Sequence, residues 1–307
     1  MFRYLLSLII AGTFLISCGG GGGSGDSNPP PVIKTAPKVG LAILGLLNAG
    51  FPVDEAIDLL SVSSRPTFSF IHKTFGENPQ NYITLVDNLR SQGKSPHVGI
   101  YAICGPCRPP RRDGSLVKFR PDLNVSELNR LLANDARVQE DFRNYLIDLR
   151  QNIVMLYNDL EYDIYPELES NMDFNAQQKA LEIAREVFSG MSNVRIVINP
   201  VSNNRHPGAP LEIHTDWAGN LPLVGAGEAI SMDGQLLNFR DEAGLRGPSF
   251  EETKKFVSDA VAKGVIFYLW RHEWQGLNRE GRRPPAPDNR TYKFTRKDEI
   301  KELLLLE

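Results

Sequence analysis

Four acidic side chains, Glu167, Glu169, Asp216 and Asp233, each follow closely on a short apolar run of the sequence. In an extended chain Glu167 and Glu169 share a face. Two carboxyl groups held close together raise the pKa of one of them, as a general acid requires. A carboxylic acid and a carboxylate acting as nucleophile or base cleave glycosidic bonds. We take Glu169 or Glu167 as the candidate acid and Asp233 or Asp216 as its partner.

Structural roles are the alternative for the same acids. Glu167 and Glu169 would then lie in a solvated loop or pair with an arginine of the segment 108–112. Asp216 and Asp233 would cap a helix or form a turn, and Asp233 precedes a glycine as turn residues often do.

Further polar and aromatic side chains follow the same apolar runs. Sugar sites combine aromatic faces, which stack on the apolar faces of the rings, with amides and charged groups that bind hydroxyls. We expect substrate binding from the following residues: His72, Asn171, Asn199, His214, Trp217, Arg271, Glu273 and Trp274.

A metal site is the alternative for the histidines. His72, His214 and His272 end three of the apolar runs, and imidazoles bind zinc. The sequence lacks the HxH and HExxH spacings of such sites, so we predict no metal. It also lacks GxGxxG and GxxxxGK[ST] after any apolar run, so we predict no nucleotide cofactor.

The quartet CGPC, Cys104 to Cys107, is typical of thiol oxidoreductases. A reactive dithiol needs its first cysteine at the start of a helix that lowers the thiol pKa. Pro109 and Pro110 follow at once and work against such a helix. We therefore predict a disulfide between Cys104 and Cys107 that closes a small ring, with a thiol oxidoreductase as the less favoured interpretation.

Strands and helices alternate along the chain, which predicts a parallel sheet. Near-continuous apolar character indicates strands buried on both faces. Seven runs are clear, and 38–44 supplies an eighth, although the overlapping Gly-rich stretch 40–50 is ambiguous and could be helical instead. The expected strands are 38–44, 67–72, 97–103, 161–166, 194–200, 211–217, 228–234 and 264–270. We predict a (β/α)8 TIM-type barrel, with an open doubly wound sheet as the alternative.

Helical spacing of apolar residues predicts the elements between the strands. Ser249 and Glu252 form a capping box before one of them, and Gly190 and Gly264 end two. The expected helices are 52–60, 81–94, 124–135, 136–160, 173–190, 249–264 and 295–307. In parallel sheets function gathers at the carboxyl ends of the strands, where the candidate residues stand.

The placement of the acids loosely resembles a large clan of (β/α)8 glycoside hydrolases. In that clan the acid/base follows strand four and the nucleophile follows strand seven. With 38–44 as strand one, Glu167 and Glu169 follow strand four and Asp233 follows strand seven. The clan has Asn-Glu at strand four and Glu at strand seven, whereas this chain has Pro-Glu-Leu-Glu and Asp.

The first 34 residues read as a targeting segment and a tether. A basic start precedes an apolar run too short to cross a membrane. The ending LISC resembles the lipobox of bacterial lipoproteins, which implies cleavage after residue 17 and lipid attachment at Cys18. An ordinary signal peptide with an incidental cysteine is the alternative. The Gly- and Pro-rich segment 18–34 is a tether, and Gly19 in place of Asp favours the outer membrane.

Composition sets the remaining expectations. The chain is 41% hydrophobic and 23% charged with a net charge of −3, so no nucleic acid is expected as a partner. Residues 35–307 suit a single domain. We predict a lipoprotein of the bacterial envelope, anchored to the membrane through Cys18, that acts on a polysaccharide. A carbohydrate-binding or envelope-structural lipoprotein without catalysis is the alternative.

Overall fold

A computed structural model describes the parts of the chain that form its regular elements, all within one compact unit, Ile33–Glu307. The described residues are 38–43, 45–47, 51–72, 79–102, 120, 123, 125–166, 174–199, 209–210, 212–215, 223–232, 249–270 and 297–306. The predicted signal peptide, the tether and the CGPC quartet lie outside these residues.

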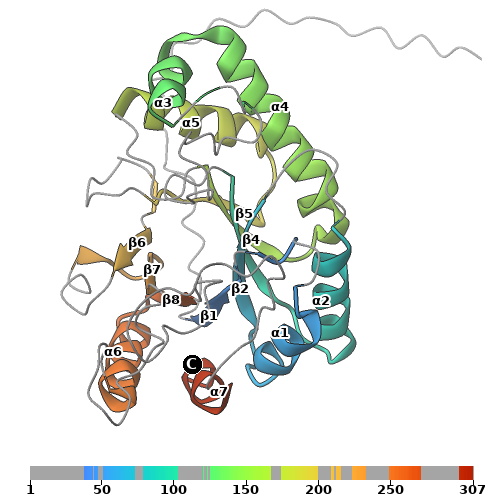
Figure 1. Ribbon diagram of the computed structural model, residues 1–307, viewed down its shortest axis with the longest axis vertical. Coiled ribbons are helices and arrows are strands. Elements are labelled where there is room, and N and C mark those ends of the chain that lie inside the picture. The colour runs from blue at the N-terminus through green and yellow to red at the C-terminus, as the bar shows by residue number, and fades with distance from the viewer. Residues whose placement is uncertain are drawn as a thin grey trace, which may run out of the picture. The chain divides into compact units, whose positions relative to one another are not determined.

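Eight parallel strands form one sheet in the described chain, in the order β5-β4-β3-β2-β1-β8-β7-β6 (Figure 1). The strands are β1 Lys38–Ala42, β2 Thr67–Ile71, β3 His97–Tyr101, β4 Glu161–Tyr165, β5 Val194–Ile196, β6 Glu212–Thr215, β7 Ala229–Met232 and β8 Ile266–Trp270. The segment 38–44 is therefore a strand over its first five residues and not a helix.

Two backbone hydrogen bonds join the two ends of this strand order. The Ile198 N–H donates to the Pro210 carbonyl at 3.0 Å, and the Glu212 N–H donates to the Ile198 carbonyl at 2.8 Å. Ile198 lies two residues beyond β5, and Glu212 begins β6. The sheet thus closes on itself, which confirms the (β/α)8 barrel and excludes the open sheet.

Helices surround the strands, as Figure 1 shows. Those described are α1 Val53–Leu60, α2 Gln80–Ser91, α3 Val125–Asn134, α4 Ala136–Asn152, the short 3-10 helix η1 Val154–Tyr157, α5 Phe174–Val187, α6 Phe250–Ala262 and α7 Lys297–Leu304. The predicted capping box of Ser249 and Glu252 is present at α6. Gly190 and Gly264 have positive φ angles of 79° and 83°, as helix-ending glycines do. No helix among the described residues is long and apolar enough to cross a membrane.

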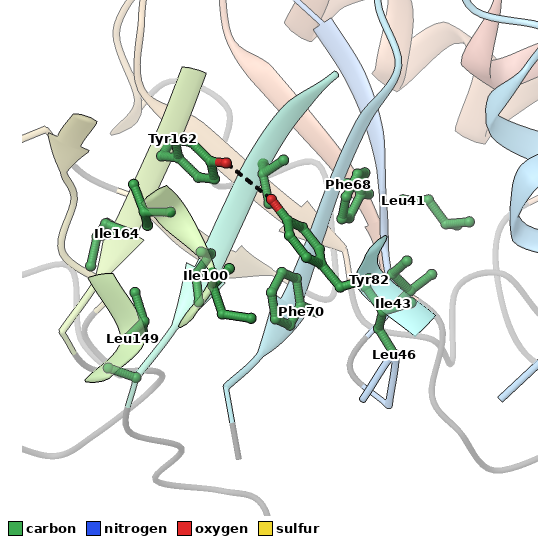
Figure 2. Close-up of a cluster of buried hydrophobic side chains, with 14 of the residues drawn as sticks. Leu41, Ile43, Leu46, Phe68, Phe70, Tyr82, Ile100, Leu149, Tyr162 and Ile164 are labelled. Atoms are coloured by element: carbon green, nitrogen blue, oxygen red, sulfur yellow. Dashed lines mark hydrogen bonds between the residues drawn. The ribbon is translucent and has the colours of Figure 1, made fainter. Parts of the chain in front are cut away.

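The larger part of the core lies between the strands and the helices. Outward side chains such as Phe68, Phe70 and Ile164 are fully buried there (Figure 2). The hydroxyls of Tyr82, on α2, and Tyr162, on β4, are hydrogen-bonded at 3.0 Å. This bond satisfies two polar atoms in an otherwise apolar layer, as burial requires.

The inside of the barrel holds a second, smaller cluster of buried side chains. Its hydrophobic members are Ala42, Tyr101, Tyr165, Val197, Ala229, Ile266 and Tyr268. Residues alternate between the two faces of a strand, so every second residue of each strand points inward. Gly40 and Gly99 occupy two inward positions, where they leave room for the larger neighbours.

Gly40→Ala is expected to lower the free energy of unfolding by about 1–3 kcal/mol, the usual effect of overpacking. An added Cβ would lie 2.7 Å from Cγ2 and 2.9 Å from the carbonyl oxygen of Thr67. Gly225→Ala is the control, since its Cβ meets only Glu228 Oε2 at 3.5 Å. Urea unfolding of both variants measures the difference. Equal stability of the two would contradict the close packing of β1 against β2.

Candidate functional site

Three tyrosines and a glutamate fill the barrel below the carboxyl ends of the strands. Tyr101 is the last residue of β3, Tyr165 the last of β4, and Tyr268 lies on β8. The rings of Tyr101 and Tyr165 are stacked, with centroids 4.4 Å apart and planes at 27°. The Tyr101 hydroxyl donates a hydrogen bond to Oε1 of Glu212 at 2.8 Å. All four side chains are fully buried, so they form the floor beneath the strand ends.

Burial keeps these tyrosines in the neutral phenol form. It raises the pKa of Tyr101, Tyr165 and Tyr268 well above 10, and the nearby negative charge of Glu212 raises it further in each. A neutral phenol retains its proton, so its hydroxyl can donate a hydrogen bond to a carboxylate. The three tyrosines of the floor therefore stay uncharged at any physiological pH.

A charged network lies deeper in the barrel, toward the amino ends of the strands. The guanidinium of Arg195 makes two hydrogen bonds to Asp163, Nε to Oδ1 and Nη2 to Oδ2, both 2.7 Å long. The Nε2 atom of His97 lies 3.0 Å from Oδ2 of the same carboxylate. Burial alone would raise the pKa of Asp163, but the charges of Arg195 and His97 outweigh it and hold the pKa well below the ordinary value. Asp163 therefore stays ionised inside the barrel.

Glu161 and Lys38 connect this network to solvent. Lys38 Nζ donates to Glu161 Oε2 at 2.9 Å, and the same oxygen lies 3.2 Å from Nδ1 of His97. The Glu161 side chain is 52% exposed, whereas those of Lys38 and His97 are almost fully buried. The hydrogen bond from His97, followed by that from Lys38, lowers the pKa of Glu161 from 4.5 to about 2 against the effect of partial burial.

This pKa shift predicts a pH-dependent contribution to stability. A carboxyl group whose pKa is lower in the folded state stabilises the fold above its unfolded pKa, and loses that effect as the pH falls toward the folded pKa. Glu161→Gln is expected to be less stable than the wild type at pH 7, with a gap that closes between about pH 4.5 and pH 2. Denaturant unfolding at a series of pH values measures the gap. A gap that is constant across this range would contradict the ionic role of Glu161.

His72 packs outside the barrel. Its Nε2 lies 3.8 Å from Oδ2 of Asp148, and its ring contacts that of Tyr145 edge-on at 5.1 Å; both partners are on α4. The Tyr145 hydroxyl lies 2.9 Å from the carbonyl oxygens of both His72 and Ala102. His72 thus packs against α4, and its predicted role in substrate binding stays a prediction. Tyr145 ties that helix to the ends of β2 and β3.

Asn199 and His214 lie where the barrel closes, Asn199 three residues beyond β5 and His214 on β6. Asn199 is fully buried, and its Nδ2 donates to the Glu212 carbonyl at 3.4 Å. His214 belongs to β6 and pairs with Ser231 of β7. The other predicted site residues lie outside the described residues: Glu167, Glu169, Asn171, Asp216, Trp217, Asp233, Arg271, Glu273 and Trp274, with Cys18, Cys104, Cys107 and His272. Their roles stay predictions.

Sequence reasoning missed Glu212, Tyr101 and Tyr165. A signal was present, because Glu212 and His214 stand two residues apart in a strand and so share a face. The bond between Glu212 and Tyr101 spans 111 residues and could not be inferred from either segment alone. Among the residues that the structure describes, no group of three or more His, Cys, Asp or Glu side chains could hold a metal ion.

Several solved structures have a fold similar to this barrel. A Bacteroidetes-affiliated GH5 cellulase linked with a polysaccharide utilization locus has a TM-score of 0.56 at 9% identity, over 87% of this chain and 90% of that one. An endo-β-1,4-mannanase from Cellulomonas fimi scores 0.52 at 11% identity, over 88% and 70%. The catalytic domain of a Pyrococcus furiosus chitinase scores 0.52 at 13% identity, over 89% and 96%.

At sequence identities this low, the structural similarity establishes the fold alone. No protein-family model matches the sequence, and no curated protein matches it. The chain is a (β/α)8 barrel.

Proposed function

We propose that this chain is a lipid-anchored, glycoside hydrolase-like protein that acts on an envelope or extracellular polysaccharide. One observation carries the proposal: the strands that precede the candidate acids are the fourth and seventh of a closed parallel barrel. Glu167 and Glu169 follow β4 by two and four residues in the sequence, and Asp233 follows β7 by one. These are the strand ends at which the clan resembled in sequence has its two catalytic groups.

The chemistry would be that of two carboxyl groups. Glu169, or Glu167, protonates the leaving oxygen, and Asp233, or Asp216, serves as nucleophile or as base for water. Sugar rings would be held by Asn171, His214, Trp217, Arg271, Glu273 and Trp274. The tyrosine floor supports this arrangement, because Glu167 follows Tyr165, a residue of the floor, by only two positions in the sequence.

The N-terminal segment supplies the proposed location. A lipid on Cys18 would hold the chain at the outer membrane, and the tether to residue 34 would let the domain reach its polymer. A disulfide between Cys104 and Cys107 is consistent with a location outside the cytoplasm, where disulfides persist. Treatment with a thiol-alkylating reagent before and after reduction, followed by mass spectrometry, tests the disulfide; labelling of both thiols before reduction would contradict it.

Hydrolysis by the full-length chain tests the proposed function. Carboxymethyl cellulose, galactomannan, glycol chitin and bacterial envelope polysaccharides are incubated with the wild type, Glu169→Gln and Asp233→Asn, and reducing ends are assayed. We expect release by the wild type from one polymer and loss of release in each variant. Glu182→Gln and Asp259→Asn are matched controls at exposed positions of the helices α5 and α6, and should retain wild-type rates.

A non-catalytic protein would give a different result. No release from any polymer, together with binding of one polymer that is equal in the wild type and both variants, would replace hydrolysis by carbohydrate binding. Release that persists in both variants would keep the hydrolase but reject these two acids.

A further inference from the structure

His97 is a buried imidazole at the amino end of the barrel, between side chains of opposite charge. It is the first residue of β3, and its side chain is 2% exposed. Its Nδ1 atom lies 3.1 Å from Nζ of Lys38, on β1, and 3.2 Å from Oε2 of Glu161, on β4. One ring nitrogen is thus within hydrogen-bond distance of an ammonium group, which only donates, and of a carboxylate, which only accepts.

Nδ1 of His97 can bond to only one of these two neighbours at a time. Without a proton it accepts a hydrogen bond from Lys38, and with a proton it donates one to Glu161. Lys38 Nζ, with three N–H donors, can keep its 2.9 Å hydrogen bond to Glu161 in both states. Protonation of the ring therefore exchanges a bond between β1 and β3 for one between β3 and β4, and sets an imidazolium N–H against the ammonium group.

The other ring nitrogen determines which of the two atoms changes. Nε2 of His97 lies 3.0 Å from Oδ2 of Asp163, a fully buried carboxylate that is paired with Arg195. Burial raises the pKa of Asp163, but the charge of Arg195 outweighs it and holds that pKa well below its ordinary value. A negative oxygen at this distance favours a proton on Nε2 in both states. Nδ1 is then the atom that gains or loses a proton.

The described charged groups around the ring keep their charge between pH 5 and pH 8. The pKa of Glu161, ordinarily 4.5, is lowered to about 2, chiefly by the hydrogen bond from His97. Burial lowers the pKa of Arg195, but the charge of Asp163 outweighs this effect and raises it. On β2 the residue paired with His97 is Thr67, which carries no charge. Histidine is the side-chain type whose charge ordinarily changes in this pH range.

We propose that His97 is a proton-operated switch at the amino end of the barrel: deprotonated, it binds Lys38, and protonated, it releases Lys38 and binds Glu161. The Glu161 side chain is 52% exposed, so its carboxylate is the point at which protons from solvent reach the buried ring. The inference does not depend on the proposed function, because it concerns the amino ends of the strands and not the carboxyl ends considered for catalysis.

Nitrogen NMR of the full-length chain tests the switch. Histidine is labelled with ¹⁵N at both ring nitrogens, and the signals of His97 are assigned by their absence in His97→Gln. We expect Nδ1 to change from the chemical shift of a protonated nitrogen at pH 5 to that of a nitrogen with a free lone pair at pH 8, while Nε2 stays protonated. An Nδ1 signal of one kind throughout pH 5–8, or loss of the proton from Nε2 instead, would overturn the inference.

Two variants should move the pH midpoint of this change in opposite directions. Lys38→Met removes a positive charge and the donor to Nδ1, and should raise the midpoint by at least about one pH unit, the effect of unit charges roughly 3 Å apart even in water. Glu161→Gln removes the anion and should lower the midpoint by a similar amount. Both variants retain His97, so opposite movements identify its signal if His97→Gln does not fold.

A surface variant provides the control for these midpoints. Lys255 lies on α6 with its side chain 74% exposed, so Lys255→Met removes an equal charge far from solvent exclusion and should leave the midpoint in place. Midpoints that are unchanged in Lys38→Met and Glu161→Gln would contradict the exchange of partners at Nδ1.

The switch also makes the contribution of Lys38 to stability depend on pH. At pH 8 Lys38 is bound to His97 and Glu161, whereas at pH 5 it is bound to Glu161 and faces an imidazolium ion. Lys38→Met should therefore lower the urea concentration at the midpoint of unfolding more at pH 8 than at pH 5. Glu161 titrates below this range and does not contribute to the difference. An equal loss at the two pH values would contradict the proposal.

Discussion

Asp163→Asn is expected to lower the free energy of unfolding by about 3–5 kcal/mol, the usual effect of removing one partner of a buried ion pair. The Asp163 side chain is fully buried, and that of Arg195 is 10% exposed. Asparagine would leave the guanidinium without its counter-charge inside the barrel. Urea unfolding at pH 7, monitored by circular dichroism, measures the loss.

A surface pair in the same protein provides the control. Asp159 accepts a hydrogen bond from Arg90 at 2.7 Å, and both side chains are exposed. Asp159→Asn should lower the free energy of unfolding by no more than about 1 kcal/mol, the usual contribution of an exposed ion pair. An equal loss of unfolding free energy in Asp159→Asn and Asp163→Asn would contradict the burial of the Asp163 pair.

A double replacement separates the charge from the packing. Asp163→Leu with Arg195→Met removes both charges and leaves apolar volume in their place. We expect it to be more stable than Asp163→Asn, because no unpaired charge is left in the core. A double variant that is less stable than the single one would show that the pair stabilises the fold beyond mutual neutralisation.

The second large effect concerns catalysis. Glu169→Gln and Asp233→Asn are each expected to lower kcat by about 10²–10⁴-fold, the range attributed to a positioned acid or base. Residues that act as one unit are not additive, so the double variant should be little slower than the worse single variant. Initial rates of reducing-end release by the three variants measure this.

Additive losses would contradict a joint role. If kcat of the double variant is lower by the product of the two single effects, the two acids act in independent steps or at separate sites. If kcat is lower in only one single variant, the partner of that acid is Glu167 or Asp216.

Local patterns in the sequence were sufficient for the elements and their order. Ser249 and Glu252 mark the start of α6 by side chains that bond to the adjacent backbone, so the signal is contained in four residues. Strands buried on both faces read as apolar runs, and eight such runs alternating with helices predict a barrel. The segment 38–44 was ambiguous, because its strand conformation depends on pairing with β2 and β8.

The inside of the barrel could not be predicted in the same way. Asp163, His97 and Arg195 lie on three neighbouring strands, β4, β3 and β5, and the pairing of these strands brings the three side chains within hydrogen-bond distance. The environment of His72 could not be predicted either. It follows a strand, as a site residue would, and the structure packs its ring against Tyr145 of α4.

The measurement that tests the central claim most directly is the time course of reducing-end release from the polysaccharide panel by the full-length wild type, beside the Glu169→Gln/Asp233→Asn double variant. We predict steady release from one polymer by the wild type and release at least about 10²-fold slower by the double variant. Equal rates for the two proteins, or no release by the wild type from any polymer, would contradict hydrolysis at the carboxyl ends of β4 and β7.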